Sequence, residues 1–355
     1  MAPMTTWSAN PDETISDEEL DYYRARANGA GLILTGCTHV QPSGIGFTDE
    51  FAAYDDRFIP SLRKLASAAK NGGATAVLQL FHAGNKAVPG LVPGGELVSA
   101  SAVVAPKGPF NEGKQAGREL TEQEIHDVIR DFGEATRRAI EAGFDGIELH
   151  GAHGFLLQNF LSPWSNLRTD QWGGSLQNRM RFPLQVVREV RRVISEHADR
   201  PFLLGYRISP EESLEGGLRI DETLAFAEQL AEEGHVDYLH TSLYDILSGR
   251  AQQDTTGKTI AERFIERMAG RIPLMAAGQI RTPEQARKVV EMGLALVVVG
   301  RSLVMNPQWV EMAQTGREAE ISLTLDLFSD PETLKIPAKL WHAIKFTPGW
   351  FPVNA

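Results

Sequence analysis

The chain has 355 residues, of which 42% are hydrophobic and 23% are charged, the composition of an ordinary globular protein. Its net charge of −11 disfavours nucleic acid or an anionic membrane surface as a partner. The single cysteine, Cys37, excludes an internal disulfide and a cysteine-ligated iron–sulfur cluster, so a cytoplasmic location is expected, and no apolar run is long enough to predict a transmembrane helix.

Short apolar runs that predict strands alternate with amphipathic segments that predict helices. In chain order, the predicted strands cover residues 1–5, 31–35, 76–80, 146–149, 202–208, 237–240, 273–277 and 296–299. The predicted helices cover residues 17–28, 57–70, 122–142, 176–196, 222–233, 258–268, 283–292 and 303–314. This alternation favours one α/β domain, a (β/α)8 TIM barrel, over a doubly wound sheet, because no GxGxxG motif follows any of the strands.

The barrel is expected to span residues 1–333, with two additions. Residues 84–120 follow the third predicted strand and are rich in Gly and Pro, which predicts a lid-like insertion over the active site. Residues 334–355 carry four aromatic side chains, so this tail is expected to dock on its own barrel or on a neighbouring subunit of a homo-oligomer. Because the first predicted strand begins at residue 1, the segment that usually precedes it is expected to be missing.

Polar side chains gather at the predicted carboxyl ends of the strands, where barrels of this type place their functional residues. They include His82, His150, His153 and Arg207. The histidines could bind a metal ion, but no carboxylate cluster accompanies them. Hydrogen bonding to a carbonyl or an oxyanion fits them better, and no metal site is expected.

The ends of the seventh and eighth predicted strands point to a phosphate site. Gly278 follows the seventh strand, and Gly300 and Arg301 follow the eighth. Glycine lets the backbone approach a ligand closely, a helix beginning after Gly300 would present N–H groups, and a guanidinium can bind phosphate through two hydrogen bonds.

Several motifs, taken in this order and spacing, resemble the Old Yellow Enzyme family of FMN-dependent NADH:flavin oxidoreductases of the ene-reductase type. The resemblance covers nearly the whole chain. It rests on residues 2–5 (APMT), 79–84 (QLFHAG), 145–150 (DGIELH), 153–157 (HGFLL), 277–278 (AG) and 300–301 (GR), and the stretch 160–182 is especially specific.

The resemblance implies tightly but non-covalently bound FMN, with NAD(P)H as the reductant. The implied cofactor-binding residues are Pro3, Met4, Thr5, Cys37, Gln79, Arg207, Gly278, Gly300 and Arg301. In the family, the position of Gln79 bonds the flavin pyrimidine ring, that of Arg207 faces the N1/O2 edge, and those of Gly278, Gly300 and Arg301 hold the phosphate.

The resemblance also implies a small-molecule reaction. His150 and His153 match the catalytic pair that grips a carbonyl or nitro oxygen, and Trp7, His82 and Phe155 are expected to bind the substrate. The implied chemistry is ping-pong reduction of activated alkenes such as enones, or of quinones or nitro compounds. Many members carry a proton-donating Tyr where this chain has Phe155, so the proton is expected from water or another residue.

Two alternatives stay open on the residues alone. A non-catalytic or redox-sensing flavin-binding barrel is favoured by Phe155, which cannot donate a proton. A phosphate- or metal-dependent TIM-barrel lyase or isomerase would use the same fold, and the absence of a carboxylate cluster argues against it.

Overall fold

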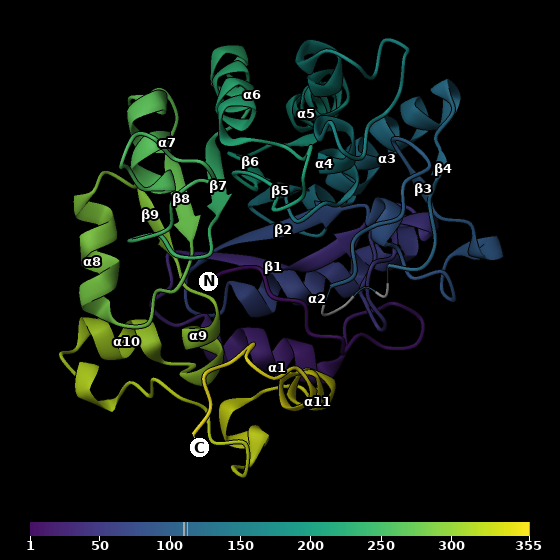
Figure 1. Cartoon of the computed structure of the whole chain (residues 1–355). Helices are drawn as coiled ribbons and strands as arrows, with labels where there is room; N and C mark the ends of the chain where they lie inside the picture. Colours follow the sequence, from purple (N-terminus) through teal and green to yellow (C-terminus); the bar gives the residue numbers. More distant parts are fainter. Residues whose placement is uncertain (109–110, 112, 355) are drawn as a thin grey trace.

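The computed structural model describes residues 1–108, 111 and 113–354; positions 109, 110 and 112 of the predicted insertion and position 355 of the predicted tail lie outside them. Among the described residues, seven parallel strands form one curled sheet (Figure 1). In order across the sheet they are β1 (Leu32–His39), β2 (Thr75–Phe81), β5 (Gly146–Gly151), β6 (Leu203–Ile208), β7 (Tyr238–Ser242), β8 (Leu274–Ala277) and β9 (Leu296–Val298). Each strand pairs with the next of this sheet along the chain, as in a (β/α)8 barrel.

The segment before β1 is not a strand, although the sequence predicts one over residues 1–5. Its backbone nevertheless bonds to both edges of the sheet. The carbonyl oxygen of Met1 accepts a hydrogen bond from the Leu34 N–H at 3.2 Å, and the Ala2 N–H donates to the Val299 carbonyl at 2.8 Å. Pro3 has no N–H to donate, which interrupts the ladder. The segment therefore lies at the seam of the barrel, in the place of the predicted first strand.

Helices surround the sheet (Figure 1). Their bounds are α1 (Asp17–Arg26), α2 (Ile59–Ala69), α3 (Glu122–Glu141), α4 (Leu156–Leu161), α5 (Leu176–His197), α6 (Ile220–Glu233), α7 (Ile260–Met268), α8 (Pro283–Glu291), α9 (Arg301–Met305), α10 (Trp309–Gln314) and α11 (Ala338–Phe346). In α3, Ile125, Val128 and Phe132 are buried at helical spacing, and Thr121 and Glu124 form a capping box. The apolar residues at helical spacing therefore form the buried face of α3.

One predicted helix, over residues 303–314, is wrong as a single element. The chain forms α9, breaks at Asn306, and begins α10 at Trp309. Asn306 has φ −134° and ψ 87°, which is not helical. The reason is Pro307, whose ring disfavours the helical conformation of the residue before it.

Side chains fill the inside of the barrel in two layers of different chemistry. The lower layer is a cluster of mainly apolar side chains that consists of Ala2, Leu34, Val77, Tyr238, Met275 and Val298. Above it, the fully buried polar side chains of Gln79, Glu148 and His240 bond to one another. Gly205 makes room for the Tyr238 ring, since a Cβ atom there would lie 2.0 Å from Tyr238 Cζ. The apolar cluster therefore separates the polar layer from the bottom of the barrel.

The described part of segment 84–120 is held by fixed contacts. It contains the short helices η3 (Gly84–Lys86) and η4 (Pro93–Gly95), and its strands β3 (Val98–Ser99) and β4 (Arg118–Glu119) pair with each other. Arg168 Nη1 donates to the carbonyl oxygens of Ala100, at 3.2 Å, and Leu120, at 2.7 Å. The middle and the last residue of the segment are therefore tied to the loop that follows α4.

The C-terminal tail packs on its own barrel. Leu340, Trp341 and Ile344 of α11 are buried, while Phe346 is 72% exposed. The Arg26 guanidinium of α1 is fully buried, and its Nη atoms donate to backbone carbonyl oxygens of Tyr22, Val304, Leu334 and Lys335. Figure 1 accordingly shows α11 beside α1. The homo-oligomer expected through this tail stays a prediction.

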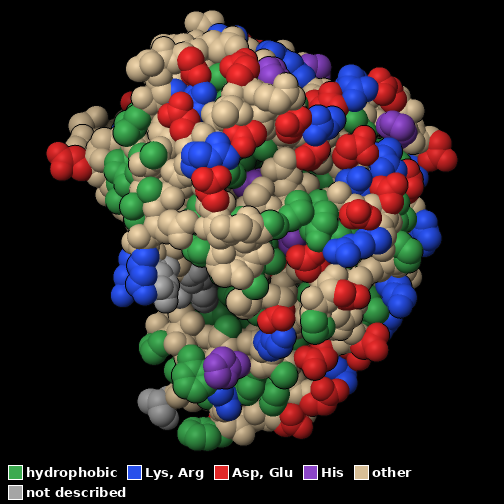
Figure 2. All heavy atoms as spheres, turned by 90° about the vertical axis from the view of Figure 1, so that its right-hand side faces the viewer, with side chains coloured by type: hydrophobic (Ala, Val, Ile, Leu, Met, Phe, Trp, Pro, Cys, Tyr) green, Lys and Arg blue, Asp and Glu red, His purple; other side chains and the backbone are tan. Residues whose placement is uncertain are grey.

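Charged side chains of both signs mix on the face that Figure 2 shows, with acidic and basic groups interspersed. Arg118 illustrates this pattern, because it pairs with Glu96 at 2.9 Å and with Glu124 at 2.6 Å. In the part of the chain that the structure describes, none of the helices has the length and apolar character needed to cross a membrane.

Candidate functional site

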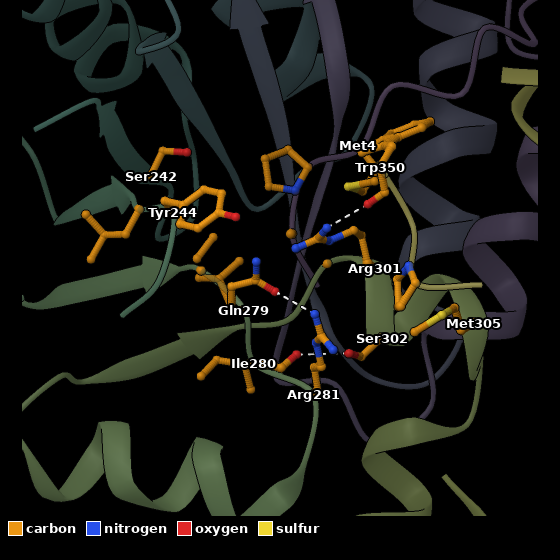
Figure 3. Close-up of a pocket in the computed structure, with 18 of the residues that line it drawn as sticks. Met4, Ser242, Tyr244, Gln279, Ile280, Arg281, Arg301, Ser302, Met305 and Trp350 are labelled. Atoms are coloured by element: carbon orange, nitrogen blue, oxygen red, sulfur yellow. Dashed lines mark hydrogen bonds between the residues drawn. The ribbon is translucent and has the colours of Figure 1, made fainter. Parts of the chain in front are cut away.

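A cavity of about 440 Å³ opens at the carboxyl ends of the strands (Figure 3). The N-terminal segment, the ends of β6 to β9 and the C-terminal tail each contribute to its wall. Its lining residues include Met4, Arg207, Ser242, Gly278, Arg301 and Trp350. Residues from both ends of the chain therefore meet at the same site.

Two guanidinium groups, those of Arg281 and Arg301, line this cavity (Figure 3). Arg301 Nη1 donates to the Trp350 carbonyl oxygen at 2.6 Å, and Arg281 Nη2 donates to Gln279 Oε1 at 3.1 Å. Partial burial and the nearby charge of Arg281 lower the pKa of Arg301. Two cations held this close favour an anionic ligand between or beside them.

The two predicted glycines, Gly278 and Gly300, line the same cavity. A Cβ atom on Gly278 would lie 2.9 Å from the Leu243 carbonyl oxygen, which is too close without a shift of the backbone. Gly300 directly precedes α9 and has φ −103° and ψ −99°. Glycine at position 278 therefore allows the close packing of the chain against Leu243 at the wall of the cavity.

Arg207 brings a positive charge into the middle of the cavity from β6. Its side chain is 7% exposed, and Nη2 donates to Ser242 Oγ at 3.0 Å. Its Nε atom is buried and has no hydrogen-bond partner among the described residues. Burial lowers the pKa of Arg207, and the negative charge of Glu148 opposes this effect. A buried guanidinium with an unused N–H is well suited to an oxygen or nitrogen acceptor in the cavity.

Gln79 lies beside this charge, between Cys37 and Glu148. Its Nε2 donates to Glu148 Oε1 at 2.7 Å, and its Oε1 lies 3.5 Å from Cys37 Sγ. Burial raises the pKa of the Cys37 thiol, so the group stays protonated and neutral at neutral pH. Cys37 is therefore a weak hydrogen-bond donor here and not a thiolate.

The histidine pair of the HGAH sequence is also assembled. The ring centroids of His150 and His153 are 5.0 Å apart, and His153 Nε2 lies 2.7 Å from Ser242 Oγ. Burial, followed by the charge of Arg207, holds the pKa of both imidazoles well below the ordinary value. Both rings are therefore neutral at neutral pH. His150 Nδ1 accepts from the Ala152 N–H at 3.3 Å, which leaves the proton of the neutral ring on Nε2 as a donor.

Aromatic rings form a wall beside the pair. The Phe155 ring packs edge-on against Phe81, at 4.9 Å between centroids, and against His150, at 4.8 Å. Phe47 contacts Phe155 at 6.2 Å and Trp7 at 5.6 Å. This wall is apolar, so it can hold a flat organic molecule without offering it a proton.

A second cavity, of about 290 Å³, adjoins His153. Lys86 and residues 106–108 of segment 84–120 line it, together with Glu211 and Glu212. Lys86 Nζ donates to the His153 carbonyl oxygen at 2.5 Å and lies 5.9 Å from the centroid of the Phe155 ring. Segment 84–120 thus contributes side chains next to the histidine pair.

His82 lies apart from the other predicted site residues. It is 1% exposed, its Nδ1 accepts from the Gly84 N–H at 3.1 Å, and its Nε2 is 3.3 Å from Ser43 Oγ. Its ring packs against Gly44, where a Cβ atom would lie 2.8 Å from His82 Cδ2. These contacts make His82 part of the loop packing, and it lines neither of the two cavities described above.

The other predicted residues divide between the cavity surface and the layer behind it. Pro3, Met4, Arg207, Gly278, Gly300 and Arg301 line the cavity of about 440 Å³. Sequence reasoning missed Ser242, Tyr244, Arg281 and Trp350, which line it too. A signal for Arg281 was present, since it stands directly before the helix cap Thr282, in the loop between β8 and α8.

No group of three or more His, Cys, Asp and Glu side chains is arranged to hold a metal ion within the described ranges. The polar groups that surround the site are mainly donors and cations. Their chemistry suits an anionic or carbonyl-bearing ligand better than a metal ion.

Residues 1–320 match the sequence profile of the NADH:flavin oxidoreductase / NADH oxidase family. The probable NADH-dependent flavin oxidoreductase YqiG of Bacillus subtilis (strain 168) is 44% identical over 352 residues, which cover 99% of this chain and 92% of that protein. The NADH:fumarate oxidoreductase of Klebsiella pneumoniae (strain 342) is 38% identical over 348 residues. That match covers 96% of this chain and 36% of the relative, so the chain spans about a third of its length.

Solved structures are similar as well. Morphinone reductase in complex with tetrahydroNAD aligns with a TM-score of 0.76 and 29% identity, over 94% of this chain and 89% of the other. The curled parallel sheet and this similarity together fit the barrel that the sequence predicts.

Proposed function

Because the chain belongs to the NADH:flavin oxidoreductase / NADH oxidase family, we propose that it reduces activated alkenes such as enones, or quinones or nitro compounds, by ping-pong hydride transfer. Membership confirms the resemblance indicated by the motifs. The protein is an oxidoreductase that works with FMN and a nicotinamide reductant. The family assignment therefore favours this activity over the two alternatives, a flavin barrel without catalysis and a metal-dependent lyase.

The donors of the cavity of about 440 Å³ fit FMN. FMN needs cationic groups at its phosphate and hydrogen-bond donors at its pyrimidine carbonyls. Arg301 and Arg281 line the cavity, and so does Arg207 of β6, whose Nε is unused. When bound, FMN supplies the hydride chemistry that side chains lack. The proposal assigns the phosphate to Arg301, Gly278 and Gly300 as the motifs imply, and adds Arg281.

The inner end of the cavity would hold the flavin ring. Gln79 offers an oxygen acceptor and an N–H donor from a fixed amide, the pattern that complements a pyrimidine imide. Arg207 would stabilise the negative charge that develops at the N1/O2 edge when electrons arrive. Pro3, Met4 and Thr5 would lie along the ring, and the neutral thiol of Cys37 would lie beside it.

The histidine pair supports binding of a carbonyl or nitro oxygen. His150 presents an N–H at Nε2, and the two ring centroids are 5.0 Å apart, so two neutral donors can converge on one oxygen. A neutral imidazole N–H can donate a hydrogen bond to a polarised oxygen. Hydrogen bonds of this kind that strengthen as charge develops on the oxygen accelerate the reaction. Phe155 and Trp7 would bound the substrate pocket.

The proton that completes alkene reduction needs a source other than Phe155. Lys86 supports one assignment, because its ammonium is held at the His153 carbonyl and lies over the Phe155 ring. Burial lowers the pKa of Lys86, which makes proton transfer from it easier. We assign Lys86 as the proton source, either directly or through a water molecule.

The observation that best supports this function is that Arg207 and His153 both hydrogen-bond to Ser242. Its hydroxyl bonds Arg207 at 3.0 Å and His153 at 2.7 Å, which joins the proposed flavin cavity to the histidine pair. The test starts with the purified protein, which should be yellow and should lose its visible flavin absorbance under anaerobic NADH or NADPH. Adding an enone should restore it. A colourless protein that does not take up added FMN would overturn the proposal.

A further inference from the structure

Glu148 is a carboxylate in the middle of the barrel, with no exposure to solvent. It contacts Gln79 through one oxygen, at 2.7 Å, and His240 through the other, at 3.0 Å. Burying a carboxylate is costly unless partners compensate its charge. A residue of this kind therefore points to a role that an apolar side chain in the same place could not perform.

The first consequence concerns the orientation of the Gln79 amide. An ionised carboxylate only accepts hydrogen bonds, so the NH₂ group of Gln79 must face Glu148. The Gln79 carbonyl oxygen then points the other way, toward Cys37. Without Glu148, the amide could turn over, and it would present a donor where the proposed pyrimidine ring also presents its N–H donor.

The second consequence concerns charge. Burial alone would raise the pKa of Glu148, but His240, Arg207 and the hydrogen bond from Gln79 hold it below its ordinary value. The side chain is therefore ionised, and it partly offsets the positive charge of Arg207. Burial keeps His240 neutral, so its Nδ1–H serves as a donor to the carboxylate.

We propose that Glu148 is a positioning residue that fixes the Gln79 amide for the flavin and, by offsetting Arg207, lowers the reduction potential of bound FMN. The inference rests on the proposed function, in which Gln79 and Arg207 meet the flavin. On this proposal, the polar layer of Gln79, Glu148 and His240 sets how readily bound FMN accepts electrons.

Two variants separate the two effects. Glu148→Gln keeps an oxygen that can accept from Gln79 but removes the charge, so the midpoint potential of bound FMN should become more positive while FMN affinity changes little. Glu148→Asp keeps the charge on a side chain that is shorter by one methylene, so the midpoint potential should stay close to that of wild type. The dissociation constant for FMN should rise about tenfold, the loss expected for one hydrogen bond to a charged group.

The measurements are an anaerobic potential titration against a reference dye and a fluorescence titration with FMN. Glu233→Gln is the matched control, since Glu233 pairs with Arg188 on the outer helices, and its potential should equal that of wild type. An unchanged potential in folded Glu148→Gln, or unchanged FMN affinity in Glu148→Asp, would overturn the inference alone. A wild-type protein that holds no FMN would overturn the proposed function itself.

Discussion

Arg301 donates a hydrogen bond of 2.6 Å from Nη1 to the backbone carbonyl oxygen of Trp350. The contact joins the start of α9 to the C-terminal tail across the edge of the cavity (Figure 3). Only one of the five N–H groups of the guanidinium is needed for it. The same side chain can therefore hold the tail and bind an anion.

Loss of either guanidinium should weaken FMN binding. Arg301→Gln and Arg281→Gln should each raise the dissociation constant of FMN about tenfold or more, because each removes a charged donor proposed for the phosphate. Flavin fluorescence during titration measures this change. Arg317→Gln is the control, since Arg317 is paired with Glu311 and Glu320 away from the cavity. Riboflavin, which lacks the phosphate, should bind the variants and wild type alike; a loss of riboflavin affinity would contradict the assignment.

Replacing the buried cation should slow electron uptake. Arg207→Gln should make the midpoint potential more negative and slow anaerobic reduction by NADH about a hundredfold to a thousandfold, the range seen when one preorganised donor is removed from a site of developing charge. Stopped-flow absorbance gives the rate. Arg188→Gln, on the outer surface, should reduce like wild type. If NADH reduces Arg207→Gln as fast as wild type, Arg207 does not stabilise the reduced flavin.

Phe155→Tyr should speed the alkene half-reaction. A phenol at this position would supply the proton donor that many relatives carry, so reoxidation by an enone should accelerate by up to about a hundredfold, while reduction by NADH stays nearly unchanged. The two half-reactions are followed separately by stopped flow. If both are unaffected, another proton source already serves the reaction.

Lys86→Met tests which group that source is. It should slow enone-dependent reoxidation about tenfold or more and leave reduction by NADH close to wild type, because reduction by NADH needs no proton from this position. Combining it with Phe155→Tyr should restore the lost rate. Lys107→Met, which alters the other lysine of the same cavity, is the control. A double variant as slow as Lys86→Met would argue against proton transfer from Lys86.

The protein should lose stability in mild acid through His82. Burial lowers the pKa of His82 to about 3 in the folded state, below the ordinary value of 6.5. As the pH falls below that ordinary value, the unfolded chain binds a proton that the folded chain does not. The stability from neutral His82 is therefore present above about pH 6.5 and is lost below it.

A pH series of urea unfolding curves measures this. Between about pH 6 and pH 4, His82→Asn should lower the slope of unfolding free energy against pH by about 1.4 kcal/mol per pH unit, the value for one proton. An unchanged slope would mean that His82 takes up its proton in the folded state.

The strand order and most of the cavity could be predicted from the sequence, because the hydrophobic period of each element and the residues at each strand end are local features of the sequence. Gly278, Gly300 and Arg301 could be found since they directly follow strands. Trp350 could not, because its place depends on how a tail some fifty residues beyond β9 folds back, and no local pattern encodes that. His82 directly follows β2 in the sequence, but its ring packs against Gly44, a contact between distant parts of the chain that no local pattern encodes.

The Arg26 guanidinium fastens the last turn of α9 and the start of the tail with a single group, through Val304, Leu334 and Lys335. The same guanidinium therefore holds both the tail and α9, whose first residue is Arg301. Departure of the tail and departure of the cofactor should consequently behave as one cooperative event. A protease that cuts near residue 334 would report cofactor loading, cleaving the empty protein first and the loaded protein late.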